Sequence, residues 1–240
     1  MENVMKIFNE YVKNYDLKKS SIMGKFHHSY RVMELSKEIA TSLNLNNEDI
    51  KLASIIGLLH DIGRFEQCTK YETFIDDISI DHGDLAEEIL KQEILSKLDL
   101  EDNDKKIILT SVRNHNKFMI EPNLKEKELL MCQIIRDADK LDILKEQIKV
   151  MDKNYDINKE LINILKEHKL ILNKYVKTPM DGLCRHISLL FDLHFPYSYK
   201  FVQKNNIVDN IMNMMEIYSN TNQEELEIDV KKYIKERLSC

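Results

Sequence analysis

Histidine and aspartate side chains stand inside or beside apolar segments of this 240-residue chain. His60 and Asp61 follow the apolar run IIGLL. Burial of both side chains would be costly unless they were paired or bound to a metal ion. The alternative for His60 is a structural histidine at the carboxyl end of a helix, where the helix dipole stabilises it. The dipeptide alone therefore indicates either a metal site or a helix terminus.

His28 lies one helical turn before an apolar stripe formed by Val32, Leu35 and Ile39. It continues this stripe, so we expect its side chain to face the core. There it is either a metal ligand or a buried histidine that forms a hydrogen bond with a neighbouring group. His27 lies one position off the stripe, and we expect it to be exposed.

Asp139 belongs to the segment IIRDADKLDIL, in which Leu141 and Leu144 indicate a buried face. A carboxylate in such surroundings needs a cation nearby. Arg136 and Lys140 could provide the positive charge, and so could a metal ion.

The elements that must position these side chains are predicted to be helices. Five glycines and three prolines are few for this length, and apolar residues recur at helical spacing almost throughout. The pattern predicts helices over residues 1–15, 27–43, 47–62, 82–94, 104–115 and 124–150, with three or four more from residue 158 onward. The predicted amino-terminal caps are Asn46 or Asn47, Asp81 and Asn103.

The predicted interruptions are few. A polar stretch through Gly24 separates the first two helices, and Gly63 is expected to end the third in a left-handed conformation. The segment 64–80 has no clean helical stripe and is predicted to be a surface loop with a short helical turn. Pro122 marks the break before the long helix that carries Asp139.

The order of these residues resembles the signature of the HD superfamily of metal-dependent phosphohydrolases. The histidine His28, the pair His60-Asp61 and the final Asp139 occur in the order H…HD…D, within the strings HSYRVMELSKEIA, LLHDIGRF and RDADKLD. The resemblance covers about residues 20–150. It implies an all-α, HD-type helical bundle with additional C-terminal helices. We therefore expect a single domain, 1–240, with an HD core of about 20–150 and a helical extension of about 155–240.

The resemblance also implies a set of ligands for one or two divalent ions. The first ion would be held by His28, His60, Asp61 and Asp139, and the second by Asp61, His82 and His115. The alternative for His82 and His115 is capping or hydrogen bonding near helix ends. Imidazoles with carboxylates suit iron, manganese, nickel, cobalt or zinc. Asp61 and His60 would be the catalytic residues, acting on a metal-activated water and on the leaving oxygen.

The expected substrate is a small phosphate ester, with a nucleotide preferred. Arg64 and Lys140 are the cations nearest the motifs and are candidates to bind its phosphate; the alternative for both is a solvated or paired surface charge. A non-catalytic module that binds metal or nucleotide is the competing class, and a di-iron oxygenase on the same scaffold is a third.

Composition limits the partners and the location. The net charge of −6 argues against broad nucleic-acid binding. No apolar run approaches the roughly 20 residues of a membrane-spanning helix, so we expect no membrane partner. Four singly spaced cysteines indicate reduced thiols. We expect a cytoplasmic protein and leave a homo-oligomer open.

Overall fold

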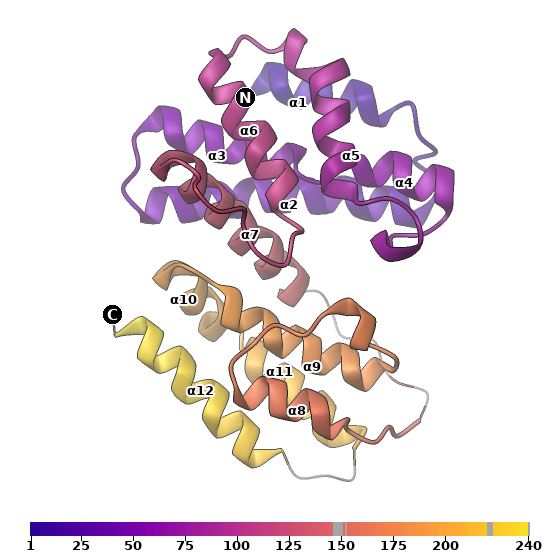
Figure 1. The fold of residues 1–240 in the computed structure, drawn as a ribbon, viewed down its shortest axis with the longest axis vertical. Coiled ribbons are helices and arrows are strands. Elements are labelled where there is room, and N and C mark those ends of the chain that lie inside the picture. Colours follow the sequence, from indigo (N-terminus) through magenta and orange to yellow (C-terminus); the bar gives the residue numbers. More distant parts are fainter. Residues whose placement is uncertain (146–150, 152, 220–222, 240) are drawn as a thin grey trace. The chain divides into compact units, whose positions relative to one another are not determined.

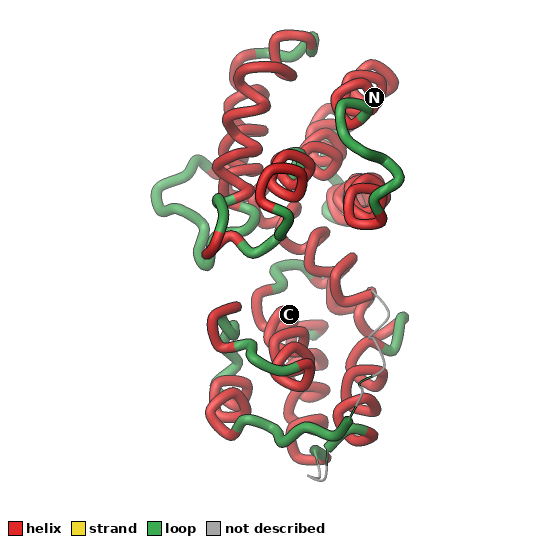
Figure 2. The backbone as a smooth tube through the Cα atoms, turned by 90° about the vertical axis from the view of Figure 1, so that its right-hand side faces the viewer, coloured by secondary structure: helices red, strands yellow, loops and turns green. Residues whose placement is uncertain are grey.

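The computed structural model describes residues 1–145, 151, 153–219 and 223–239. These residues form helices and loops without a strand, as Figure 2 shows, so the fold is all-α as predicted. The chain divides into two compact units, Met1–Asp139 and Lys140–Cys240. Whether they act as one domain stays a prediction. None of the described helices has the length and apolar character needed to cross a membrane.

The first unit is a bundle of helices, whose colours in Figure 1 run from indigo through magenta. Its helices are α1 (Glu2–Val12), α2 (Ser20–Ser42), α3 (Asn47–Leu59), α4 (Gly63–Tyr71), α5 (His82–Ile89), α6 (Asp102–Asn114) and the larger part of α7 (Glu126–Lys145). The long helix α2 packs along α3, while α5 packs against both α4 and α6. Fully buried apolar side chains fill the space between them, among them Phe8, Ile22, Ile39, Ile55, Leu58, Phe65 and Ile107.

Side-chain caps fix where two of these helices begin. Asn46 accepts a hydrogen bond from the Asp49 amide at 2.9 Å, and Asp81 accepts one from the Gly83 amide at 2.9 Å. Both caps satisfy amides that the helix leaves unpaired. The predicted cap Asn103 is wrong, because α6 already begins one residue earlier and its N-cap makes no side-chain hydrogen bond.

Gly24 is part of a helix and does not lie between two helices, contrary to the prediction. Helix α2 begins at Ser20 and runs through Gly24, around which a methyl group would meet open space. Ile22 is fully buried, and burial of such a side chain contributes roughly 1.5–3 kcal/mol. The packing of Ile22 stabilises the first turn of α2, which the polar sequence does not predict. As a result, Lys25 lies on the same helix as His28.

Gly63 does not end a helix in a left-handed conformation, and this prediction is also wrong. No glycine has a positive φ, and Gly63 begins α4. A Cβ at this position would lie 2.5 Å from the His82 carbonyl oxygen and 2.8 Å from the Ala86 nitrogen. The glycine is therefore required by the close approach of α4 to α5.

The first half of the predicted surface loop 64–80 is a helix. Helix α4 continues to Tyr71 and ends where Glu72 takes a left-handed conformation, with φ of 54°. Phe65 is fully buried, and its ring lies edge-on to Phe8 at 5.9 Å between centroids. The tertiary packing of this aromatic side chain stabilises the helix, although apolar residues in the segment do not recur at clear helical spacing. The irregular part is 72–81, which contains one 3-10 turn.

The second unit contains α8 (Lys159–Lys166), α9 (Pro179–Leu189), α10 (Pro196–Lys204), α11 (Ile207–Ile217) and α12 (Glu224–Leu238). In Figure 1 it runs from orange to yellow. Helix α9 packs on α8 and α11, and α12 packs on α8, α10 and α11. The described residues of this unit form these five α-helices, where three or four are predicted. Met212 and Met215 of the MNMM run are buried in this unit.

Candidate metal centre

Six side chains from five parts of the first unit meet at one place. His28 lies on α2, and His60 and Asp61 directly follow α3. His82 is the first residue of α5, and His115 directly follows α6. Asp139 completes the set from α7. The four histidines and Asp61 are at most 4% exposed, and the Asp139 side chain is 18% exposed.

One half of the cluster surrounds His28. Its Nε2 lies 3.2 Å from His60 Nε2, 3.4 Å from Asp61 Oδ2 and 3.1 Å from Asp139 Oδ1. His60 Nε2 lies 3.6 Å from each of the same two carboxylate oxygens. These four side chains are the predicted ligands of the first ion, and their ligand atoms converge.

The other half of the cluster uses the second oxygen of Asp61. His82 Nε2 and His115 Nε2 lie 3.0 Å apart, at 3.4 and 3.5 Å from Asp61 Oδ1. The His60 and His115 rings also meet edge-on at 5.0 Å between centroids. Asp61 therefore stands between the two groups of histidines, with one oxygen turned toward each.

Hydrogen bonds on the far side of each ring fix how three imidazoles face the cluster. His60 Nδ1 donates to the Gly57 carbonyl at 2.8 Å, and His115 Nδ1 donates to the Val112 carbonyl at 2.6 Å. His82 Nδ1 instead faces a carboxylate, at 2.6 Å from Asp76 Oδ2. A ring that donates through Nδ1 presents the Nε2 lone pair to the cluster, as a metal ligand must.

The charge states also suit a cation. Burial lowers the pKa of His60 and lowers that of His82 to about 4, so both rings are neutral near pH 7. Burial alone would raise the pKa of Asp61, but the Lys25 ammonium holds it well below its ordinary value. A hydrogen bond from His28 likewise holds the pKa of Asp139 well below its ordinary value. Neutral imidazoles with ionised carboxylates are the forms that bind metal.

The donor set fits divalent ions. Metal–ligand bonds of about 2.1 Å place neighbouring ligand atoms roughly 3.0–3.4 Å apart, close to the spacings in both halves. Two overlapping triads, His28-His60-Asp139 and His60-Asp61-His115, each keep their ligand atoms within 4.8 Å of one another. The structure thus brings together all six predicted ligands. Which of them bind an ion stays a prediction.

Two cations lie beside the cluster, and the sequence predicts one of them. Lys25 Nζ lies 2.8 Å from Asp61 Oδ2, and Arg64 Nε lies 3.7 Å from Asp61 Oδ1. Both cationic groups lie 5.7 Å from the centroid of the Phe74 ring. Lys25 was not predicted, because the sequence of its turn of α2 resembles a polar linker. Its spacing of three residues before His28 is the signal that could have found it.

Lys140, the other predicted phosphate-binding residue, pairs within the second unit. Its ammonium lies 2.8 Å from Asp192 Oδ2, and its side chain is 8% exposed. A paired cation was the alternative for this residue, and the ion pair with Asp192 corresponds to it. Its role in substrate binding stays a prediction.

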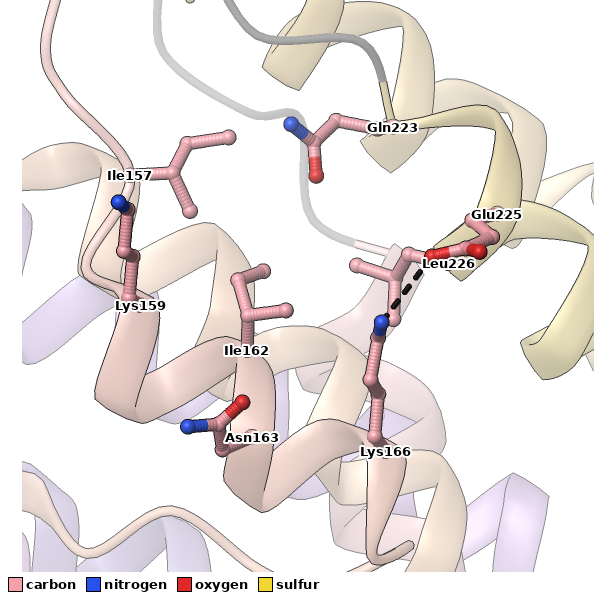
Figure 3. A pocket seen from close by; sticks show the side chains of 8 residues that line it. All are labelled: Ile157, Lys159, Ile162, Asn163, Lys166, Gln223, Glu225 and Leu226. Carbon is pink, nitrogen blue, oxygen red and sulfur yellow. Dashed lines mark hydrogen bonds and ion pairs between the residues drawn. The ribbon is translucent and has the colours of Figure 1, made fainter.

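The second unit also has a pocket, of about 320 Å³, between α8 and α12. Figure 3 shows that the pair Lys166–Glu225, at 3.0 Å, stands at its edge. Its lining residues are Ile157, Lys159, Ile162, Asn163, Lys166, Gln223, Glu225 and Leu226. None of the predicted site residues is among them, so this pocket is separate from the candidate metal centre.

Comparison with known proteins assigns part of the chain to a family. Residues 26–144 match the HD domain family. Residues 26–144 are therefore an HD domain, the domain that defines a superfamily of metal-dependent hydrolases. No curated protein matches the sequence. Among solved structures, it is similar to a "predicted HD superfamily hydrolase" from an uncultured Thermotogales bacterium, with 20% identity, a TM-score of 0.45, and coverage of 85% of this chain and 87% of that one. These values are too low to transfer an activity.

Proposed function

We propose that the protein hydrolyses a phosphate ester of a small molecule, with a nucleotide as the preferred substrate. The observation that carries the proposal is the position of Asp61 between two groups of inward-facing imidazoles, with Lys25 and Arg64 beside it. Divalent ions bound by these ligands would lower the pKa of a water molecule and polarise a phosphoryl oxygen. A cytoplasmic location belongs to the same proposal.

The residues of the chain supply position and charge. Asp61 stays ionised, so its oxygens accept hydrogen bonds and orient the attacking water. His60 is held by the Gly57 carbonyl, which keeps its Nε2 directed at the cluster. Asp139 is the more exposed carboxylate and lies where solvent reaches the site.

Lys25 and Arg64 are suited to receive the phosphate. Arg64 Nε is a buried N–H group with no hydrogen-bond acceptor among the described residues, beside Asp61. A buried donor of this kind costs about 1–3 kcal/mol unless an acceptor reaches it. A phosphate oxygen over the cluster would provide that acceptor, while the Lys25 ammonium would balance its charge.

The test is a substrate screen on protein loaded with a defined metal. Protein treated with EDTA is reloaded with Mn²⁺, Co²⁺ or Fe²⁺ and assayed with nucleoside mono-, di- and triphosphates, cyclic nucleotides and bis(p-nitrophenyl) phosphate. We expect metal-dependent release of phosphate or of an alcohol. Bound metal with no hydrolysis of any phosphate ester would overturn the proposal. In that case oxygen consumption by iron-loaded protein would indicate an oxygenase, and its absence would indicate a binding module.

A further inference from the structure

Asp76 stands behind His82 in the irregular segment 72–81, outside every helix that holds a predicted ligand. Its Oδ2 lies 2.6 Å from His82 Nδ1, on the side of the ring opposite to Nε2. The other fixed rings, His60 and His115, donate to backbone carbonyls instead. Of these three rings, His82 is thus the one whose Nδ1 faces an anionic partner.

Four donors converge on the two oxygens of Asp76. Oδ1 accepts from Arg64 Nη1 at 3.0 Å and from Gln67 Nε2 at 2.8 Å. Oδ2 accepts from His82 and from Asn116 Nδ2, the latter at 3.2 Å. A carboxylate is the side chain that accepts at both oxygens, whereas an amide would turn its NH₂ group toward two donors. The surroundings therefore specify an aspartate at this position.

This arrangement has a consequence for the proposed second metal position. A carboxylate that accepts from a histidine fixes its tautomer and makes the ring a stronger ligand. The first group of ligands has no such dependence on segment 72–81, because its members come from α2, α7 and the end of α3. The two positions therefore differ in what supports them.

We propose that Asp76 is a positioning residue that selectively strengthens metal binding at the position formed by Asp61, His82 and His115. The inference rests on the proposed binuclear centre. It assigns to the segment 72–81 the function of holding Asp76 against His82. Arg64 takes part in this function too, since the same guanidinium reaches Asp76 and the Phe74 carbonyl at 3.0 and 2.6 Å.

The test compares Asp76→Asn with two control variants of the same segment. Asp77→Asn removes the same charge from the next residue, whose side chain is exposed. Ser79→Ala removes the Gln67–Ser79 hydrogen bond of 3.0 Å and loosens the segment without touching Asp76. Mn²⁺ is titrated into each EDTA-treated, full-length protein by calorimetry. The His115→Ala variant identifies which binding step belongs to the second position.

We expect two steps in the wild-type protein. Asp76→Asn should weaken the step lost in His115→Ala by about 10- to 100-fold and leave the other step unchanged. Both controls should bind as the wild type does. The thermal midpoint of each metal-free variant is measured in parallel, because a purely structural role would lower this midpoint and weaken both steps together.

The outcomes separate the two proposals. A single step in the wild-type protein would overturn the binuclear centre and, with it, the role of Asp76. Two wild-type steps that Asp76→Asn leaves unchanged, or weakens equally, would overturn the role of Asp76 alone. An equal effect of Ser79→Ala on the second step would assign the effect to the loosened segment and would also overturn it.

Discussion

Lys25 Nζ lies 2.8 Å from Asp61 Oδ2, so the central carboxylate of the cluster has an ammonium group on the oxygen that also faces His28. The Lys25 side chain is 23% exposed, and it reaches the cluster from the first turns of α2. A cation in this position is close enough to the ligands to contact a substrate bound over them. This relationship connects the metal ligands to the proposed phosphate site.

Lys25→Gln should therefore impair turnover without emptying the centre. A hydrogen bond to a charged group contributes about 1.5–3 kcal/mol, which corresponds to roughly 10- to 100-fold in kcat/KM. Metal content should stay at the wild-type value, because none of the proposed ligands is removed. Steady-state kinetics with the best ester from the screen, together with elemental analysis, measures both quantities.

The matched control is Lys37→Gln, on the same helix. Lys37 pairs with Glu34 at 3.6 Å on the surface, and both side chains are more than half exposed. Its kcat/KM should equal that of the wild type. Wild-type kinetics in Lys25→Gln would remove this lysine from the phosphate site.

Asp61→Ala should abolish both metal retention and turnover. The carboxylate has an oxygen within 3.6 Å of Nε2 in each of the four histidines, so its loss removes the shared ligand of both positions. Metal content after gel filtration and hydrolysis rates measure the effect. Asp84→Ala, which changes an exposed carboxylate, serves as the control. Full activity in Asp61→Ala would refute the site.

His115→Ala should lower the metal content from two ions to about one per chain. The variant removes a ligand from one side of Asp61 and leaves the group around His28 intact. His186→Ala is a suitable control, because His186 lies on α9 in the second unit. Elemental analysis of the reloaded proteins gives the ratio. An unchanged ratio would leave only the four-residue site in place.

The sequence predicts the ligands better than it predicts their supports. The side chains of all six predicted ligands come together, because each lies at a helix end or on an apolar stripe, and such positions can be recognised locally. Lys25 and Asp76 could not be predicted in the same way. Lys25 acts from a turn that depends on the burial of Ile22, and Asp76 acts from an irregular segment held by Arg64 and Gln67. Both depend on contacts between residues distant in sequence.

The errors in the fold have a similar origin. The segment after Gly63, expected to be a loop, is a helix because Phe65 packs against α1. The spacing of apolar residues within the segment does not predict this contact. Residues 146–150 of the long helix predicted over 124–150 lie outside the described residues, and the described part of α7 spans Glu126–Lys145. After residue 158 the described residues form five α-helices, where three or four are predicted.

Gly63→Ala and Gly24→Ala should change stability in opposite directions. A methyl group at Gly63 would press on the backbone of α5, and overpacking of this kind costs about 1–3 kcal/mol. A methyl group at Gly24 meets no atom within 4 Å in the structure, and alanine in a helix is more stable than glycine by about 0.5–1 kcal/mol. Urea-induced unfolding of the metal-free proteins, followed by circular dichroism, measures the two shifts.

The first of these variants also tests how the fold serves the site. The atom closest to the added Cβ is the carbonyl oxygen of His82, so Gly63→Ala should displace this ligand and weaken Mn²⁺ binding at the position that it shares with His115. Gly24→Ala should leave Mn²⁺ binding unchanged although it lies one residue from Lys25. A Gly63→Ala protein that matches the wild type in both stability and Mn²⁺ affinity would show that α4 and α5 do not need this close approach to place His82.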